Sequence, residues 1–210
     1  MKKFALLPLT LVLAACGSTG MNIAPFQDKA AAPDKFYVCH GYGCTHKTWA
    51  GFTESEWKKI TGLFKTKPKN AAAERAQIGK AIGLMEKYAG QKSGTAGDLG
   101  EARTRKEDQN QMDCIDETIN SDQYLQFLDD AELFRFHRHT RPVHRGYFVD
   151  GQWPHNSAAV RENETGQVWV VDSYYFGNGQ NARLVKLQEW FAGWKPPEII
   201  EQRAQKKQKR

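Results

Sequence analysis

Three residues whose types can form a nucleophilic site follow one another along the chain: Cys114, His155 and Asp172. Cys114 lies where a helix is expected to begin, and a helix N-terminus favours the thiolate form of a cysteine. His155 and Asp172 lie at the ends of two expected strands. An imidazole can take and return the proton of a thiol, and a carboxylate can hold the ring in one tautomer. The pattern therefore predicts a cysteine nucleophile served by a His–Asp pair.

The hairpin between the two strands decides whether the imidazole and the carboxylate can meet. Strands over 157–160 and 168–171 flank the turn signal at 163–166. If that turn has four residues, 162 pairs with 167, and paired numbers sum to 329. His155 and Asp172 are then diagonal neighbours on one face, about 7–8 Å apart at Cα. A two-residue loop keeps this parity, whereas a three-residue loop or a bulge inverts it. The sequence permits the pair without requiring it.

The surroundings of Cys114 contain features that act in opposite directions. Asp113, Asp116 and Glu117 favour a helix start, but their negative charge disfavours a thiolate. The developing oxyanion of an acyl transfer also needs a hydrogen-bond donor. The backbone N–H of Cys114 is one candidate, and the side chains of Gln109 and Gln111 are others.

The elements that must position these residues fall into two groups. Helical patterns come first, over 54–64 behind a Thr53–Glu56 capping box, over 71–88, and over 114–134 as one helix or as two that meet near Asn120. Strand patterns follow, and helices before antiparallel strands are typical of an α+β domain. We therefore predict N-terminal helices packed on an antiparallel sheet. The strand patterns cover 36–38, 133–138, 147–149, 157–160, 168–171 and 183–187.

The first fifteen residues have the features of an export signal. Lys2 and Lys3 precede an apolar run over 4–15, which is too short to cross a bilayer. The run ends in Leu-Ala-Ala followed by Cys16, which resembles the lipobox of bacterial lipoproteins. The resemblance implies that Cys16 is acylated and anchors the chain in a lipid membrane, and Gly17 favours the outer membrane, facing the periplasm. The alternative is an ordinary secretory signal with an incidental cysteine.

Composition bounds the rest of the chain. With 210 residues, 40% hydrophobic and 26% charged, the chain is an ordinary globular protein rather than a disordered or multi-span membrane protein. The net charge of +6 comes from Lys2, Lys3 and a tail whose charge is +4, so residues 16–200 sum to zero. We therefore expect no nucleic-acid partner. The predicted divisions are a tether over 16–35, one domain over 36–198, and a solvated basic tail over 199–210. In an alternative interpretation, the tail contacts anionic lipid or wall polymer.

Two further clusters can be interpreted in more than one way. Cys39 and Cys44 lie near His40 and His46. Such a set can bind zinc or copper, but outside the cytoplasm the two cysteines are expected to form a local disulfide. The second cluster holds three histidines among four arginines. That positive charge disfavours a cation and favours a surface that is solvated or faces an acidic ligand, so no metal site is predicted. The cluster consists of His137, His139 and His144 with Arg135, Arg138, Arg141 and Arg145.

The order of the three site residues resembles the transglutaminase-like branch of the papain-like superfamily. Asp113-Cys114-Ile115-Asp116 is similar to the Asp-Cys-x-Asp setting of the bacterial transglutaminase-like cysteine proteinases. The separations of 41 residues from Cys114 to His155 and 17 from His155 to Asp172 are also similar to that core, over roughly residues 105–190. The resemblance implies a cysteine that opens a helix and a His–Asp pair on adjacent strands, with no cofactor. Asn156 and Ser157 depart from the aromatic or small apolar residue that many members have after the histidine.

Together these observations predict an envelope lipoprotein that acts on amide bonds through an acyl-enzyme. The accessible substrates are peptides, envelope proteins and the peptides of peptidoglycan. Water would complete hydrolysis and an amine would complete transamidation, and the sequence does not choose between them. The alternative is a non-catalytic binding lipoprotein with the same fold.

Overall fold

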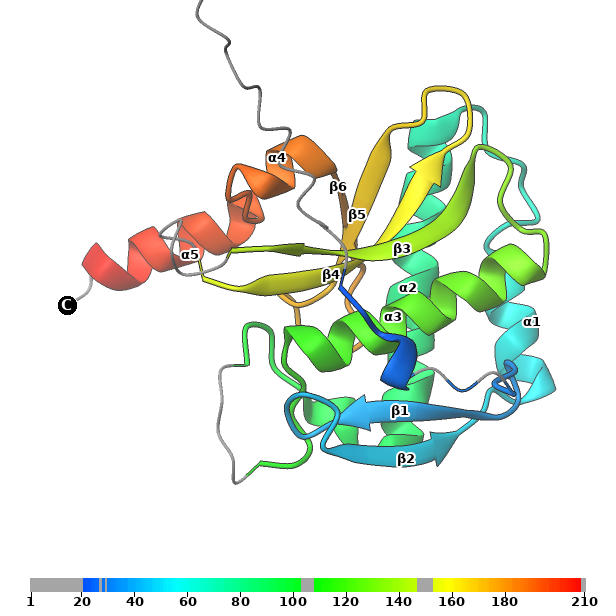
Figure 1. Cartoon of the computed structure of the whole chain (residues 1–210), viewed down its shortest axis with the longest axis horizontal. Helices are drawn as coiled ribbons and strands as arrows, with labels where there is room; N and C mark the ends of the chain where they lie inside the picture. Colours follow the sequence, from blue (N-terminus) through cyan, green and yellow to red (C-terminus); the bar gives the residue numbers. More distant parts are fainter. Residues whose placement is uncertain (1–20, 27, 29, 103–107, 147–152, 209–210) are drawn as a thin grey trace, which may run out of the picture.

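A computed structural model of the 210-residue chain describes residues 21–26, 28, 30–102, 108–146 and 153–208 (Figure 1). The predicted export signal and Cys16 lie outside the described residues, as does the predicted strand over 147–149. Within the described ranges, no helix has the length and apolar character needed to span a membrane.

The domain is α+β, as the sequence predicts, with five α-helices and two antiparallel sheets in its described part. The smaller sheet pairs β1 with β2, and the larger has the strand order β3-β4-β5-β6. The elements are β1 Phe36–His40, β2 His46–Ala50, α1 Glu54–Gly62, α2 Ala71–Ser93, α3 Cys114–Asp130, β3 His137–Arg145, β4 His155–Glu162, β5 Val168–Asp172, β6 Arg183–Lys186, α4 Leu187–Phe191 and α5 Pro197–Gln208.

The two faces of the larger sheet are covered by different helices. Successive strand side chains point to opposite faces. Ala158 and Val160 of β4 therefore pack into the main core with α2 and α3, whereas Ala159 packs with Val170 and Trp190 under α4. Figure 1 shows α3 running along one side of the sheet and α4 lying on the other, with the β1–β2 ribbon beyond α3. This arrangement brings the start of α3 near the start of β4.

Several elements differ from the sequence prediction. The region over 114–134 forms one helix that ends at Asp130, and β3 begins at His137 rather than at 133. β2 has no predicted counterpart, because its alternation places polar residues on both faces. The capping box at Thr53 is confirmed: its hydroxyl accepts the Glu56 N–H, and the Glu56 carboxylate accepts the Thr53 N–H.

The segments at the two ends of the described chain have more regular structure than the predicted tether over 16–35 and the predicted solvated tail over 199–210. Ile23 is buried against the Cys39–Cys44 pair, and the Met21 N–H donates to the Pro142 carbonyl, so the packed region begins before residue 36. At the other end, α5 begins at Pro197, because a proline has no N–H to leave unpaired in the first turn of a helix. The predicted basic tail is therefore largely a helix.

Candidate active site

Cys114 is the first residue of α3, and the turn before it is tightly held. The Asp113 carboxylate accepts the N–H groups of Ile115 and Asp116 at 2.9 and 3.0 Å, and the Asp116 carboxylate accepts the Asp113 N–H at 3.1 Å. This capping box satisfies the N–H groups that a helix start leaves without partners. Cys114 is a free, partly exposed thiol, as a nucleophile must be.

The hairpin has the register in which His155 and Asp172 can meet. Ala158 pairs with Val171 and Arg161 with Val168, so the paired numbers sum to 329, as a four-residue loop requires. His155 Nε2 lies 2.9 Å from Asp172 Oδ2, which is a hydrogen-bond distance. The same carboxylate oxygen accepts the Trp190 indole N–H at 2.8 Å. Two donors therefore fix the carboxylate, and the carboxylate fixes the ring.

The environment of His155 favours its charged form. Burial alone lowers the pKa of the imidazole, but the charge of Asp172 and the hydrogen bond to it raise the pKa, and Cys114 raises it further. The result is a pKa of about 9. The ring is therefore an imidazolium at neutral pH, and an imidazolium beside a thiol favours the thiolate. The Nε2 atom is occupied by Asp172, so Nδ1 is the nitrogen left to exchange a proton with Cys114.

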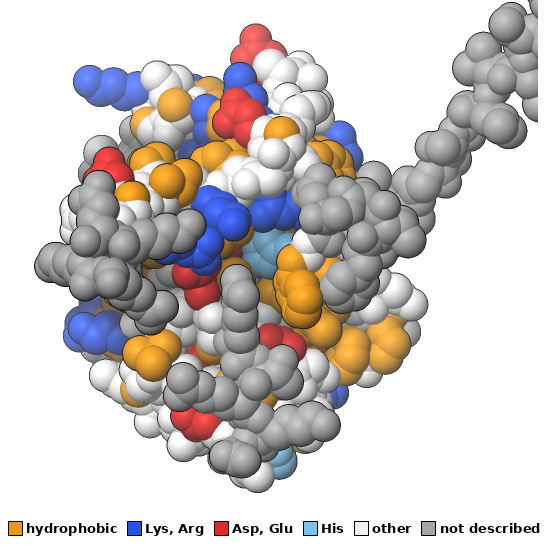
Figure 2. Space-filling view, turned by 90° about the vertical axis from the view of Figure 1, so that its left-hand side faces the viewer, with side chains coloured by type: hydrophobic (Ala, Val, Ile, Leu, Met, Phe, Trp, Pro, Cys, Tyr) orange, Lys and Arg blue, Asp and Glu red, His pale blue; other side chains and the backbone are white. Residues whose placement is uncertain are grey.

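Cys114 and His155 line the same cleft, whose volume is about 380 Å³. Its walls come from the start of α3, the start of β4, the segment after β5 and the region around α4 and α5. Figure 2 shows a histidine in a hollow of this face with Lys and Arg side chains beside it. The cleft thus exposes a thiol to solvent within a partly basic surface. The other lining residues are Glu101, Arg145, Trp153, Pro154, Tyr174, Tyr175, Ala192, Gly193, Lys195 and Arg203.

Asn156 is a neighbour of Cys114 that was not proposed from the sequence. It lies on the α3 face of β4, and its amide Nδ2 is 3.9 Å from Cys114 Sγ. Its Oδ1 lies 2.8 Å from His144 Nδ1, which orients the amide with its N–H group toward the sulfur. A donor beside the nucleophile can stabilise an oxyanion. Strand alternation indicates only that Asn156 faces away from His155, and its proximity to Cys114 depends on how α3 packs on β4.

Of the two glutamine side chains considered from the sequence as oxyanion donors, that of Gln111 is already engaged. The Gln111 side chain is buried, donates to the Gly97 carbonyl and accepts the Leu99 N–H, so both of its polar ends are occupied. Gln109 has a backbone role, with its carbonyl 2.7 Å from His40 Nδ1.

The acidic residues after Cys114 are largely buried, which changes their electrostatic effect. Glu117 accepts the Ser173 hydroxyl at 2.7 Å, and burial together with the charge of Glu86 raises its pKa well above the ordinary value. Burial and the charge of Asp113 raise the pKa of Asp116 to about 7. Burial thus favours the protonated form of Glu117. The opposition to a thiolate that the sequence suggested is correspondingly weaker.

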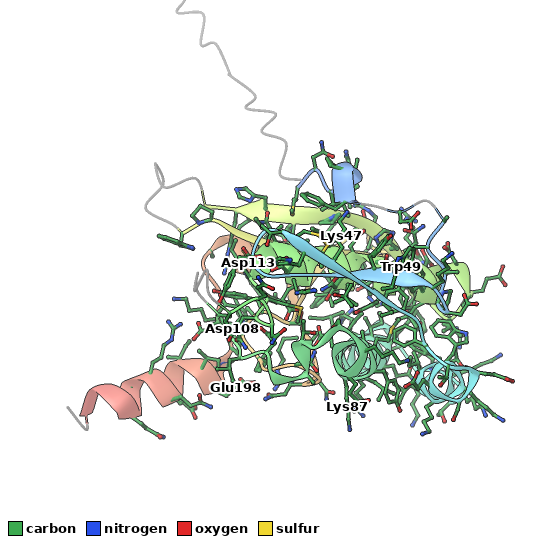
Figure 3. The ribbon with its side chains drawn as sticks, turned by 90° about the horizontal axis from the view of Figure 1, so that it is seen from below. Lys47, Trp49, Lys87, Asp108, Asp113 and Glu198 are labelled. Carbon is green, nitrogen blue, oxygen red and sulfur yellow. A yellow bond between two sulfur atoms is a disulfide. The ribbon has the colours of Figure 1, made fainter. Side chains whose placement is uncertain are left out.

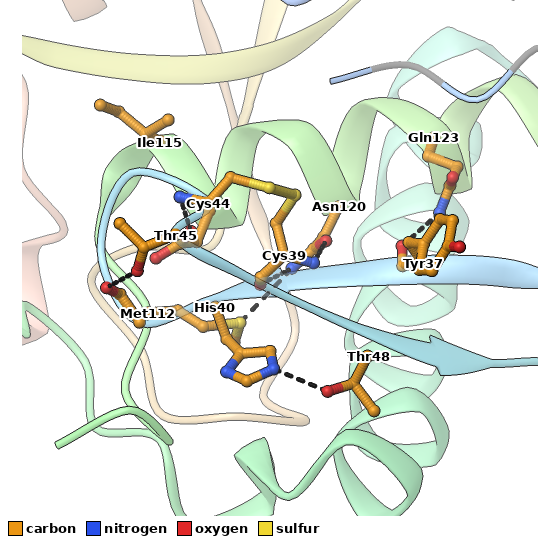
Figure 4. The surroundings of a disulfide bond; sticks show 12 residues. Tyr37, Cys39, His40, Cys44, Thr45, Thr48, Met112, Ile115, Asn120 and Gln123 are labelled. Atoms are coloured by element: carbon orange, nitrogen blue, oxygen red, sulfur yellow. Dashed lines mark hydrogen bonds between the residues drawn. A yellow bond between two sulfur atoms is a disulfide. The ribbon is translucent and has the colours of Figure 1, made fainter. Parts of the chain in front are cut away.

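The predicted disulfide between Cys39 and Cys44 is present, with 4.6 Å between the Cα atoms (Figure 4). Asn120 of α3 holds this region by accepting the Cys39 N–H and donating to its carbonyl. His40 lies between the Gln109 carbonyl and Thr48. The described residues contain no group of three or more His, Cys, Asp and Glu side chains that could hold a metal ion.

The three histidines of the second cluster do not form a common solvated surface. His137 is only 2% exposed and lies 2.7 Å from the Glu74 carboxylate. His139 lies 2.6 Å from Asp122 on α3, and His144 contacts Asn156. Each ring therefore has its own partner on another element. The expectation of a solvated cluster was wrong for His137, because the buried carboxylate of Glu74 on α2 is the partner of its ring.

Comparison with protein-family models, curated proteins and solved structures finds no match to this chain. The resemblance to transglutaminase-like proteinases therefore remains a prediction carried by the residues themselves.

Proposed function

We propose that the chain is a cysteine-dependent enzyme that acts on amide bonds through an acyl-enzyme, on the pattern of the transglutaminase-like branch of the papain-like superfamily. The observation that carries the proposal is the hydrogen-bonded His155–Asp172 pair in a cleft that also contains the thiol of Cys114. Cys114 is the nucleophile, His155 exchanges the proton, and Asp172 orients and charges the ring.

The first half of the reaction forms a thioester. The Cys114 thiolate attacks the carboxamide carbon, and the new oxyanion accepts hydrogen bonds from the Asn156 amide and the Cys114 N–H. The His155 imidazolium then donates its proton to the departing amine as the C–N bond breaks. Asp172 keeps the ring in place while its charge changes.

The second half regenerates the thiolate. Water attacks the thioester carbon and gives a proton to His155, and the C–S bond breaks to release a carboxylic acid. An amine in place of water gives a new amide by the same steps. The cleft is open to solvent, which supports hydrolysis as the ordinary outcome for small acyl donors.

The proposed setting is the bacterial envelope, with the domain anchored by acyl chains on Cys16 and acting on peptides, envelope proteins or peptidoglycan peptides. The lipobox resemblance supports this setting. A palmitate analogue fed to producing cells should label the wild type and leave Cys16→Ser unlabelled. Equal labelling of the two would remove the anchor from the proposal.

The proposal is tested first by alkylation of Cys114 with iodoacetamide at about pH 6, followed by peptide mapping of the full chain. An ordinary thiol, with a pKa near 8.5, is almost wholly protonated there and reacts slowly. Cys114 should react much faster than glutathione, and His155→Ala should lose that advantage. Reaction no faster than glutathione would favour a non-catalytic binding module.

The second test separates the nucleophile from the oxyanion donor. Acyl transfer from p-nitrophenyl acetate passes through an oxyanion, whereas alkylation does not. Asn156→Ala should therefore lower the acylation rate about 10²-fold and leave the alkylation rate nearly unchanged. Asn163→Ala, in the hairpin turn, is the matched control. Equal losses in both reactions would assign Asn156 a structural role only.

A further inference from the structure

Arg145 is a buried cation in the wall of the cleft, and its contacts are with neutral groups. Its side chain belongs to a residue that is 6% exposed, and its guanidinium stacks over the Trp190 ring at 4.4 Å. It donates to the carbonyls of Trp190 and Trp194 and, at 3.0 Å, to the Tyr175 hydroxyl. Among the described residues, no carboxylate forms an ion pair with it. A buried charge without a counter-charge is costly.

Tyr175 extends this polar wall toward the cleft. Burial and the charge of Asp172 raise the pKa of the phenol to about 12, so the hydroxyl keeps its proton. Its oxygen accepts from Arg145, and its own proton is a donor for a further acceptor. The guanidinium and the phenol together therefore form a donor group that suits an anion.

A second cation, Lys195, lies at the rim of the same cleft and is exposed. Arg203 also lines the cleft, but it forms an ion pair with Glu101, so its charge is balanced there. The carboxylate of Asp172 is likewise balanced by the imidazolium of His155. Among the described residues that line the cleft, Arg145 and Lys195 therefore carry positive charges that no ion pair balances. Figure 2 shows Lys and Arg side chains beside the hollow.

We infer that the cleft binds a carboxylate of the acyl donor, held by Arg145 and Lys195 close to the bond that Cys114 attacks. The inference rests on the proposed amide chemistry, because the anionic groups that peptides carry are the carboxylates of acidic side chains and chain ends. Guanidinium groups bind carboxylates with short, charge-assisted hydrogen bonds. The substrate class is therefore a peptide with a carboxylate near the scissile amide.

The cations could instead serve only the protein itself. Arg145 contacts carbonyl groups at the end of α4, where a cation stabilises a helix. Either cation could also stabilise the Cys114 thiolate without touching a substrate. The experiment must separate these roles from anion binding.

The test compares alkylating reagents that differ only in charge, on the full chain. The pairs are iodoacetate with iodoacetamide, and N-iodoacetylglycine with its amide. The carboxylate thus lies at two different distances from the carbon that the thiolate attacks. In each case the thiolate forms a C–S bond and iodide leaves, with no other reactant. The measured quantity is the rate ratio of anionic to neutral reagent at Cys114, relative to the same ratio for glutathione.

In the wild type, the anionic-to-neutral rate ratio of at least one pair should exceed the ratio for glutathione about tenfold or more. This is the size expected for a charge-assisted contact. Lys195→Gln, an exposed change, should lower the ratio severalfold. Arg145→Gln should lower it further, and Arg145→Lys should restore part of it. Lys87→Gln on α2 (Figure 3), an exposed lysine outside the cleft lining, is the matched control and should leave the ratio unchanged.

Wild-type ratios equal to those of glutathione for both pairs would overturn the inference, as would equal slowing of both reagents in Lys195→Gln. The second result would assign the lysine to the thiolate alone. The decisive variant is Lys195→Gln, because its exposed side chain can change without loss of the fold. Failure of the proposed function is seen separately, as slow alkylation by the neutral reagents, and does not alter the ratio.

Discussion

The disulfide loop and the cleft lie at the same end of α3 and use sulfur in opposite ways. Cys39 and Cys44 are 1% and 8% exposed, are joined to each other and pack against Ile23 and Ile119. Cys114 is a free thiol that lines an open cleft. Asp116 connects the two regions, because its carboxylate accepts the N–H groups of Tyr42 and Cys44 as well as the Asp113 N–H.

The comparison shows what makes one sulfur structural and another chemically available. A cysteine that is buried among apolar groups is inert, whereas one beside a cation at a helix start is reactive. The disulfide joins residues five apart, so the chain itself keeps them close. The site at the cleft instead combines residues of α3, β4 and β5, and 58 positions separate Cys114 from Asp172. We therefore expect that changes in the loop act on stability and changes in the cleft act on reactivity.

The largest effect is expected at Asp172. Asp172→Asn removes the charge that keeps the His155 pKa at about 9, so the imidazolium that favours the thiolate is lost. Acylation of Cys114 by p-nitrophenyl acetate should fall by about 10²–10⁴-fold. Stopped-flow release of p-nitrophenol measures it. Asp130→Asn, exposed at the other end of α3, is the control, and a loss no larger than that of the control would contradict the assigned role.

Asp116 should affect both regions. Asp116→Asn leaves one acceptor oxygen and an NH₂ group where three backbone N–H groups now meet a carboxylate. The free energy of unfolding should fall by about 1–3 kcal/mol, the cost of leaving a buried donor without its acceptor. Denaturant titration measures the fall, and the alkylation rate of Cys114 should decrease as well. A loss of stability with an unchanged alkylation rate would contradict the prediction, because Asp116 would then support the disulfide loop and not the cleft.

Removal of the disulfide should affect stability alone. The double variant Cys39→Ser/Cys44→Ser opens a short loop, for which chain entropy predicts a loss of about 2 kcal/mol. Because Asp116 still holds the N–H groups of this loop, Cys114 should keep an alkylation rate close to that of the wild type. A large decrease in that rate would show that the cleft depends on the covalent link.

The smallest effect is a pH dependence of stability. Glu117 has a folded-state pKa well above the unfolded value, so the folded chain binds more protons and stability falls as pH rises from about 4.5. His155 adds to this fall, since its stabilisation is complete below about 6.5 and is lost as pH rises through about 9.

Glu117→Gln keeps the shape of the side chain without its titration. The decrease in unfolding free energy between about pH 5 and 8 should therefore be smaller than in the wild type. Glu164→Gln, at an exposed turn position, should leave the decrease unchanged. Equal decreases in all three proteins would show that Glu117 does not titrate differently in the folded chain.

The sequence by itself was sufficient where the physical cause is local. The Thr53 capping box, the helix start at Cys114 and the Cys39–Cys44 pairing all depend on residues a few positions apart. The sequence left the loop length of the hairpin open, and the observed 329 register is the one that places His155 and Asp172 on one face, because strand side chains alternate.

Tertiary structure decided the features that depend on contacts between distant segments. Asn156 reaches Cys114 only because α3 packs on its face of β4, and the pKa of Glu117 is raised only because the side chain is buried beside Glu86. The positive surface of the cleft combines Arg145 from the end of β3 with Lys195 from beyond α4. The charge state of a side chain depends on its burial and on its distance to other charges. Neither the burial nor the distance can be predicted from the order of residues alone.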